Sequence, residues 1–213
     1  MALMTASALR DAIPELTGTA EDTKLDTLIA RADGACARFL GIPPASATGT
    51  PTMESTSYTF YLTGNGGREL WLPLRTFTAI TSIYDDPNRD YTDSTYLVSS
   101  ADYALRWDPQ RGQHVYLLST ATHGAWSDTD RAIRVVGTAG YSSGAAPGHI
   151  LEAVRIGLRN WWEERKRAGK LSTSGQASVS YMEGEDRWFL CPEVKAILGP
   201  ERLPAAMVGG GWA

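Results

Sequence analysis

A serine flanked by glycines lies near the middle of the sequence, in a pattern that could support nucleophilic chemistry. The run Gly140–Gly144, GYSSG, matches the G-x-S-x-G of a nucleophile elbow and lies between a strand-like run and a helix-like run. Such a serine needs an acid and then a histidine later in the chain. The one histidine after Ser142 is His149, with no acidic residue between them. We therefore interpret the run as a tight turn and keep a small serine hydrolase as a third hypothesis.

A second candidate is an aspartate-rich turn that resembles a calcium loop. Asp86, Asn88 and Asp90 have the one-three-five spacing of such a loop, but Tyr91 replaces its glycine and Leu97 its bidentate glutamate. The histidines have no metal-ligand spacing, and neither cysteine belongs to a C-x-x-C pair. We expect a solvated turn here, and no catalytic residue, cofactor or metal in the protein.

Aromatic residues offer a binding surface rather than a reaction. Trp71, Trp107 and Trp126 fall in the strand-rich region, where they could form a platform for sugar rings or bases. Alternatively, these tryptophans pack in the core or at a subunit interface, and this is the interpretation that we favour. A β-sandwich module that binds carbohydrate or another surface is therefore our second hypothesis.

Charge and hydropathy exclude several classes of protein. The 213 residues are 43% apolar and 21% charged, which is typical of a folded protein, and the net charge of −4 argues against a surface that grips nucleic acid throughout. No run of about 18 apolar residues is present, and the N-terminus lacks the basic segment of a signal peptide. We expect no membrane association and synthesis in the cytoplasm.

The elements that must position these residues are helical at both ends and strand-like between. Helical spacing of apolar residues predicts helices over 5–16, 21–40 and 147–168. Residues 57–141 alternate apolar and polar positions between short turns, which predicts about seven strands, with a hairpin around Gly64–Gly67. The residues after 170 read as a polar loop, a short helix and an irregular tail.

This order predicts an α+β fold with an inserted β unit. Residues 1–42 and 147–170 form the helical core, from two N-terminal helices and one long C-terminal helix. Residues 57–141 form an antiparallel β-sandwich or barrel-like unit, and residues 171–213 form the loop, short helix and extended tail. On the long helix, Leu158, Trp161 and Trp162 lie on the apolar face, and we expect them to pack against other helices or a neighbouring subunit.

The same order resembles the head–tail connector, or adaptor, proteins of long-tailed bacteriophages and gene transfer agents. The resemblance covers most of residues 5–170, and order and spacing carry it more than any single motif. It departs from the family pattern in its long, Trp-rich β section and its long tail. The matching features are Leu72-Pro73-Leu74, Ile80 to Ile83, Thr138-Ala139-Gly140-Tyr141, Pro147, and the helix that ends Trp161-Trp162-Glu163-Glu164-Arg165.

The resemblance implies a structural virion protein without catalytic residues. Such a protein would assemble in the host cytoplasm into a ring of twelve subunits under the portal protein, with a stopper or tail-completion protein on its other side. DNA would pass through the ring's channel without sequence-specific binding. The family's docking tail corresponds here to the segment that contains Leu203, Met207, Val208 and Trp212.

A basic cluster follows the tryptophans of the long helix. It comprises Arg165, Lys166, Arg167 and Lys170. These side chains could contact DNA phosphates or acidic residues of a neighbouring subunit, and they could also form a solvated helix end.

Overall fold

The structure is a computed structural model, and it consists of two compact units. It describes residues 3–13, 15, 22–142, 144–173 and 189–202. The helical unit is made of the described residues in Met1–Pro43, Thr50–Glu54 and Tyr141–Arg202. The β unit is made of Pro44–Gly49 and Ser55–Gly140.

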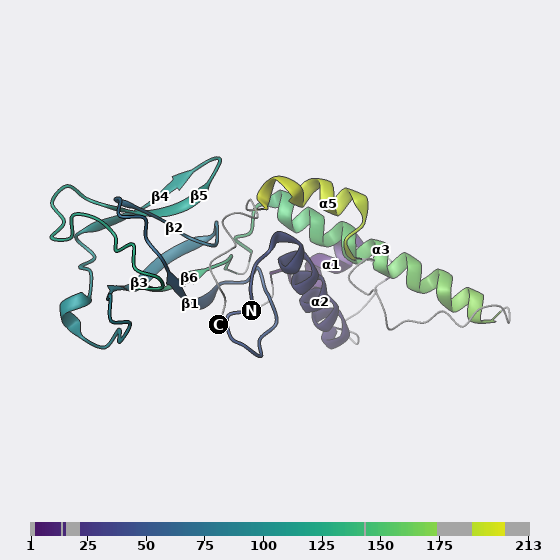
Figure 1. The fold of residues 1–213 in the computed structure, drawn as a ribbon. Coiled ribbons are helices and arrows are strands. Elements are labelled where there is room, and N and C mark those ends of the chain that lie inside the picture. The colour runs from purple at the N-terminus through teal and green to yellow at the C-terminus, as the bar shows by residue number, and fades with distance from the viewer. Residues whose placement is uncertain (1–2, 14, 16–21, 143, 174–188, 203–213) are drawn as a thin grey trace. The chain divides into compact units, whose positions relative to one another are not determined.

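The helical unit is built around a long central helix. Its helices are α1 (Ala6–Ala12), α2 (Asp22–Leu40), α3 (Gly148–Thr173) and α5 (Pro192–Leu198), and a 3-10 turn, η2 (Gly199–Glu201), follows α5. Figure 1 shows α5 lying along α3, and α1 and α2 also contact α3. The buried core of the unit includes Leu9, Leu25, Ile29, Cys36, Ile150, Val154, Leu158, Phe189 and Val194.

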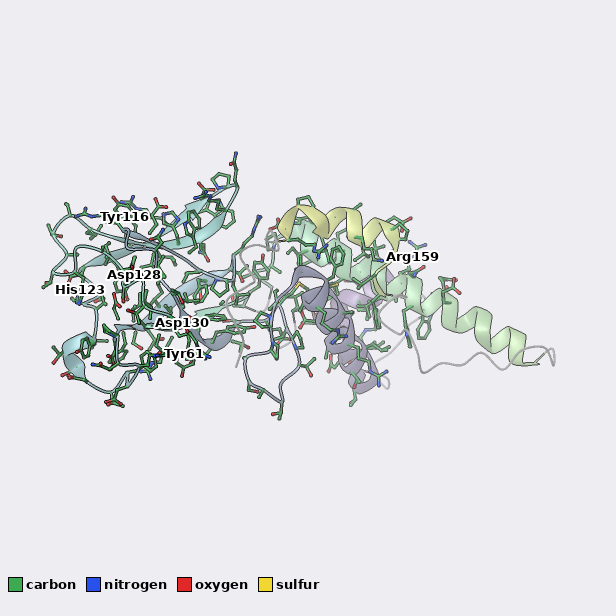
Figure 2. All side chains as sticks on the ribbon, viewed as in Figure 1. Tyr61, Tyr116, His123, Asp128, Asp130 and Arg159 are labelled. Carbon is green, nitrogen blue, oxygen red and sulfur yellow. The ribbon has the colours of Figure 1, made fainter. Side chains whose placement is uncertain are left out.

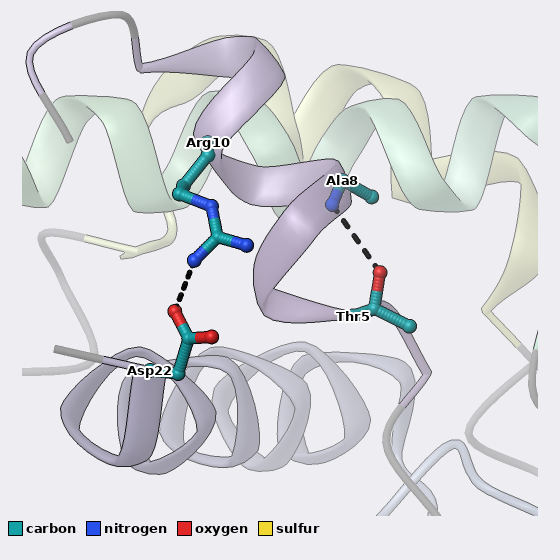
Figure 3. Close-up of polar contacts among 4 residues, drawn as sticks. All are labelled: Thr5, Ala8, Arg10 and Asp22. Atoms are coloured by element: carbon teal, nitrogen blue, oxygen red, sulfur yellow. Dashed lines mark hydrogen bonds and ion pairs between the residues drawn. The ribbon is translucent and has the colours of Figure 1, made fainter. Parts of the chain in front are cut away.

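Local interactions fix the start of α1 and join it to α2. The Thr5 hydroxyl accepts a hydrogen bond from the Ala8 backbone N–H at 3.2 Å, which caps the helix (Figure 3). The Arg10 guanidinium, in the last turn of α1, pairs with the carboxylate of Asp22 at the start of α2 (Figure 3). Asp22 also suits the positive end of the α2 dipole. One carboxylate therefore serves both helices.

A glycine allows the chain before α5 to approach α3 closely. A Cβ atom on Gly157 would lie 2.6 Å from the backbone oxygen of Phe189. The Phe189 ring then stacks on Trp161 of α3, with ring centroids 6.1 Å apart and planes 6° apart. Any larger residue at 157 would push this segment off the helix.

The β unit contains two small antiparallel sheets. In the first, β6 (Ile133–Ala139) lies between β1 (Thr56–Leu62) and β3 (Phe77–Asp85). In the second, β5 (Gly112–Leu117) lies between β2 (Glu69–Trp71) and β4 (Tyr103–Asp108). A 3-10 turn, η1 (Ser94–Tyr96), lies between β3 and β4 in the chain. The unit's buried side chains include Tyr58, Phe60, Leu70, Leu72, Phe77, Ile83, Val115, Leu117, Trp126 and Ile133.

A side-chain amide joins the two sheets. Gln113 lies on β5, and its Oε1 accepts the backbone N–H of Phe77 on β3 at 2.5 Å. Its Nε2 donates to the carbonyl oxygen of the same residue at 2.8 Å. Gln113 therefore satisfies both backbone groups of a residue in the other sheet, as a neighbouring strand would.

The predicted architecture is wrong in two respects, although the fold is α+β. The described part of the helical unit has four helices, and the last of them is the short α5 rather than a long C-terminal helix. The described β unit has six strands rather than about seven, and they form two small three-stranded antiparallel sheets in place of the predicted sandwich or barrel-like unit. The apolar face of α3 needs α5 as well as the N-terminal helices to cover it.

The predicted hairpin around Gly64–Gly67 is also wrong. β1 pairs with β6 and β2 pairs with β5, so the turn carries the chain from one sheet to the other. Gly66 has the positive φ of 69° that the sequence suggested, and Asn65 Oδ1 accepts the Gly67 N–H at 2.9 Å. The residues around Gly66 therefore form the predicted tight turn. The strands on either side of this turn pair with strands distant in the sequence and not with each other.

The long segment of residues 55–140 leaves and re-enters the helical unit at adjacent residues. Glu54 and Tyr141 form a parallel bridge, and the Tyr141 N–H donates to the carbonyl oxygen of Met53 at 2.8 Å. Residues 55–140 therefore start and end side by side.

Candidate functional site

The glycine-flanked serine is part of an exposed turn. Gly140 and Gly144 have φ values of 102° and 74°, a conformation that favours glycine. Ser142 is exposed, and its hydroxyl makes no hydrogen bond within the described part of the chain. Instead, the backbone oxygen of Ser142 accepts the Ala145 N–H at 2.9 Å. His149 is engaged elsewhere, 3.0 Å from Glu201 Oε1. His149 is therefore not placed as the base for a nucleophile at Ser142.

The aspartate-rich turn uses its carboxylate to order its own backbone. Asp86 is fully buried and accepts backbone N–H groups of Asn88 at 2.8 Å, Asp90 at 2.9 Å and Tyr91 at 3.0 Å. Burial would raise the pKa of Asp86, but these hydrogen bonds outweigh it and lower the pKa below its ordinary value. The carboxylate is therefore occupied by the turn rather than directed toward a ligand.

No metal site is formed by the residues that the structure describes, since it brings no three His, Cys, Asp or Glu side chains together for one. Within the same residues, no helix is both long enough and apolar enough to cross a bilayer.

The tryptophans of the β unit do not form one platform. Trp126 is 1% exposed, and its Nε1 donates to the carbonyl oxygen of Arg68 at 3.0 Å, so this ring cannot stack on a ligand at the surface. Trp107 is 53% exposed, with the Arg75 guanidinium 6.0 Å from its ring centroid. Trp71 is half-buried and packs on His114. A sugar site built from Trp107 and Trp126 is excluded by the burial of Trp126.

Arginines lie over aromatic rings in both sheets, an arrangement that no sequence motif predicts. The Arg106 guanidinium is 3.9 Å from the centroid of Tyr116, and Arg134 is 4.7 Å from that of Tyr84. Tyr116 and Tyr61 are labelled in Figure 2. The arginines involved are Arg75, Arg106, Arg111, Arg131 and Arg134.

This density of guanidinium–ring pairs is well above the usual one in about 70–80 residues. The sequence did contain a signal for it, because residues 55–140 hold seven arginines and no lysine. Arginine stacks on rings and still presents its N–H groups at the edge of the guanidinium plane, which makes such residues frequent in protein interfaces.

A shallow hollow of about 340 Å³ lies between α1 and α3 of the helical unit. It is lined by Ala8, Asp11, Glu152, Arg155, Ile156 and Arg159, the last of which is labelled in Figure 2. Arg155 lies 3.6 Å from Glu152, and the two arginines balance the two carboxylates. The residues that line it include no serine, cysteine or histidine.

A buried carboxylate holds the returning chain against α2. Asp33 is 3% exposed and accepts hydrogen bonds from the Thr52 hydroxyl at 2.5 Å and the Met53 N–H at 3.0 Å. Burial raises the pKa of Asp33 to about 6, although the two hydrogen bonds oppose this shift.

Several solved structures match this chain over most of its length. A chain in the virion of a native gene transfer agent particle aligns with a TM-score of 0.54 and 18% identity, covering 93% of this chain and 88% of that one. A chain in the neck of an empty particle, computed with C6 symmetry, gives the same values. A chain in the neck of a native particle, computed with C12 symmetry, gives 0.52 and 17%, covering 93% and 90%.

This chain shares its fold with chains of gene transfer agent particles. No protein-family model matches the sequence, and no curated protein matches it.

The residues expected to contact partners fall into three groups. Leu158 is 1% exposed in the helical core, and Trp161 and Trp162 are half-buried and pack against that core. The side chains of the basic cluster, Arg165, Lys166, Arg167 and Lys170, lie outside the described part of the structure. The tail residues Leu203, Met207, Val208 and Trp212 lie outside the described residues altogether. A subunit interface at the tryptophans and docking by the tail therefore stay predictions.

Proposed function

We propose that the protein is a head–tail adaptor of a phage-like particle. It forms a ring of twelve subunits between the portal protein and the stopper or tail-completion protein, and the ring encloses a channel for DNA. The protein acts structurally, without a cofactor, and resides in the virion after assembly in the host cytoplasm.

One observation carries the proposal. The fold match extends over 93% of this chain and about nine-tenths of the matched chains, so it includes both the helical unit and the β unit. Two of the matched chains belong to the neck of a gene transfer agent particle, and one of these neck structures was computed with twelve-fold symmetry. The sequence resemblance to adaptor proteins, carried by different observations, points to the same role.

The test is reconstitution with the portal protein of the same particle. The purified full chain would be mixed with portal and imaged by electron microscopy. We expect a ring of about twelve copies on one end of the portal. A portal that stays bare at concentrations far above micromolar would contradict the proposal.

The docking tail can be tested with a matched pair of substitutions. Leu203→Ala should weaken portal binding by at least roughly tenfold, because a leucine anchor buried on binding contributes about 1.5 kcal/mol or more and about 1.4 kcal/mol is a tenfold change. Leu97→Ala is the control, since Leu97 is 42% exposed in the β unit and the proposal gives it no role. Equal affinities of the two variants for portal, measured by biolayer interferometry, would remove the tail from the docking site.

A further inference from the structure

The two sheets have four edge strands, and these edges are not alike. β2 has three residues, and β3 is interrupted by register shifts between Phe77 and Ala79 and between Ile80 and Ser82. By contrast, β1 pairs with β6 in unbroken register over seven residues, and β4 with β5 over six. Short or bulged edges resist pairing with another strand, whereas long regular edges invite it. β1 and β4 are therefore the two edges able to accept a further strand.

Among the described residues, the outer edge of β1 has backbone groups at alternate residues that no strand pairs with. Gly140, next to β6, directs its N–H toward β3, where it donates to Thr76 at 3.0 Å. Alternation along the strand turns Val135, Gly137 and Ala139 toward β1, where their register partners are Phe60, Tyr58 and Thr56. The backbone groups of the intervening residues, Ser57, Thr59 and Tyr61, therefore face outward. In the part of the chain that the structure describes, no strand pairs with them.

The outer edge of β4 has the same arrangement. The Leu118 N–H donates to the Asp102 oxygen at 2.9 Å, so the bonded pairs continue at Ala104 and Arg106. The intervening residues Tyr103, Leu105 and Trp107 direct their N–H and C=O groups away from β5. The described residues place no strand against this edge either.

Exposed aromatic side chains mark both of these edges. Tyr61 on β1 is 36% exposed and Trp107 on β4 is 53% exposed, and Leu97 is the only other large hydrophobic residue in the described chain with comparable exposure. β1, with the sequence TSYTFYL, also contains no charge, proline or glycine that would discourage pairing. Tyrosine and tryptophan are the side chains most often found as interface anchors.

We propose that β1 of one copy pairs with β4 of a second copy of this chain. The inference rests on the proposed ring, whose head-to-tail contacts require two different, complementary surfaces on each subunit. The two edges are similar in length, at seven residues for β1 and six for β4. Each subunit would pair its β1 with one neighbour and its β4 with the other neighbour. The first sheet of one subunit would thereby join the second sheet of its neighbour, and Tyr61 and Trp107 would become buried.

The test uses two substitutions at one outward-facing residue. Thr59→Pro removes only an N–H that faces the open edge, so the β1–β6 hydrogen bonds remain. Thr59→Ala keeps this N–H and is the matched control. Rings on portal would be counted by electron microscopy, and self-association of the full chain followed by sedimentation velocity. We expect wild type and Thr59→Ala to assemble alike, and Thr59→Pro to lose at least tenfold in assembled fraction.

The possible outcomes separate the inference from the proposed function. If Thr59→Pro forms rings as Thr59→Ala does, the β1–β4 contact is wrong while the adaptor role stands. If wild type forms no rings, the adaptor role fails and the inference falls with it. If Thr59→Pro loses only portal binding and still self-associates, β1 takes a strand from portal, and the inference is overturned.

Cysteine pairs give a second readout that does not depend on the proline variant folding. Thr59→Cys would be combined in turn with Tyr103→Cys, Leu105→Cys and Trp107→Cys, because bonded antiparallel pairs place Cα atoms about 5.5 Å apart, within disulfide range. We expect one of these chains to form a ladder of linked subunits on oxidation. Thr59→Cys with Leu97→Cys is the control and should not. In a Cys191→Ser background, which removes the partly exposed native thiol, dimers from Thr59→Cys alone would indicate β1–β1 pairing and overturn the inference.

Discussion

The buried carboxyl group of Asp33 makes the stability of the helical unit depend on pH. Its carboxylate has almost no contact with solvent, yet it holds residues 52 and 53 against α2. Because burial raises the pKa of Asp33 to about 6, the folded chain holds this proton over a pH range in which the unfolded chain has lost it.

We predict that the free energy of unfolding falls as pH rises from about 4 to about 6. The stabilisation by protonated Asp33 is complete below the ordinary pKa of 3.8 and is lost as pH passes through the folded-state value, a change of about 3 kcal/mol. Asp33→Asn should flatten this part of the pH profile in urea titrations. Asp26→Asn, at an exposed position on α2, should retain the wild-type slope. A profile unchanged in Asp33→Asn would assign the effect to another group.

Gly157 is a second residue with a specific structural role, because the Phe189 backbone lies against it. We predict that Gly157→Ala destabilises the protein by about 1–3 kcal/mol, because the new Cβ would collide with the Phe189 backbone and outweigh alanine's better helix propensity. Gly148→Ala is the control, since nothing lies within 4 Å of a Cβ there, and it should be neutral or slightly stabilising. Thermal unfolding of both variants measures the difference, and a stabilised Gly157→Ala would refute the packing argument.

Among the elements, the two sheets are joined by hydrogen bonds from the side-chain amide of Gln113. We predict that Gln113→Leu lowers the free energy of unfolding by about 1–3 kcal/mol, because it leaves both backbone groups of Phe77 without these partners. Gln110→Leu, in the exposed turn between β4 and β5, should change stability by much less. Urea unfolding followed by tryptophan fluorescence compares them. Equal effects would show that Gln113 is dispensable.

Element types could be predicted from the sequence much better than element partners. The apolar spacing through Leu25, Ile29 and Cys36 predicted α2 within a residue of its ends, and the pattern after Pro147 predicted most of α3. Pairing was harder, because β1 pairs with β6, more than seventy residues later, and no local turn encodes this. The Asn65 turn chemistry was real, yet it favoured a hairpin that did not form.

For the candidate surfaces too, features that depend on neighbouring residues could be predicted from the sequence, and features that depend on tertiary packing could not. His149 is the one histidine after Ser142, and no acidic residue lies between them, so residue order alone argued against a nucleophile elbow; in the structure His149 lies 3.0 Å from Glu201 Oε1. By contrast, Trp107 is exposed and Trp126 is buried. This difference depends on tertiary packing, so the sequence could not predict which of the two rings is accessible. The outward edges of β1 and β4 depend on hydrogen-bond alternation, which the sequence does not specify.

At the level of the whole molecule, residues 55–140 have the form of an insertion into the helical unit. We predict that replacing residues 56–139 with a short Gly-Ser linker leaves the helical unit folded, because Met53 and Tyr141 are already hydrogen-bonded. The shortened chain should keep a helical circular dichroism spectrum and a cooperative thermal transition. Gly157→Ala introduced into it should lower that transition as in the full chain. A shortened chain without a cooperative transition would show that the helices need the β unit.

The closure at Met53 and Tyr141 also determines how the chain would respond to a pulling force. Tension applied between α2 and α3 would reach the β unit at Thr56 and Ala139, the first register pair between β1 and β6. Antiparallel strands pulled from adjacent ends open one pair at a time, so the bonds would not share the load. Once the α2–α3 contacts and the Tyr141–Met53 hydrogen bond have broken, the β1–β6 ladder would therefore open from this end, one register pair after another.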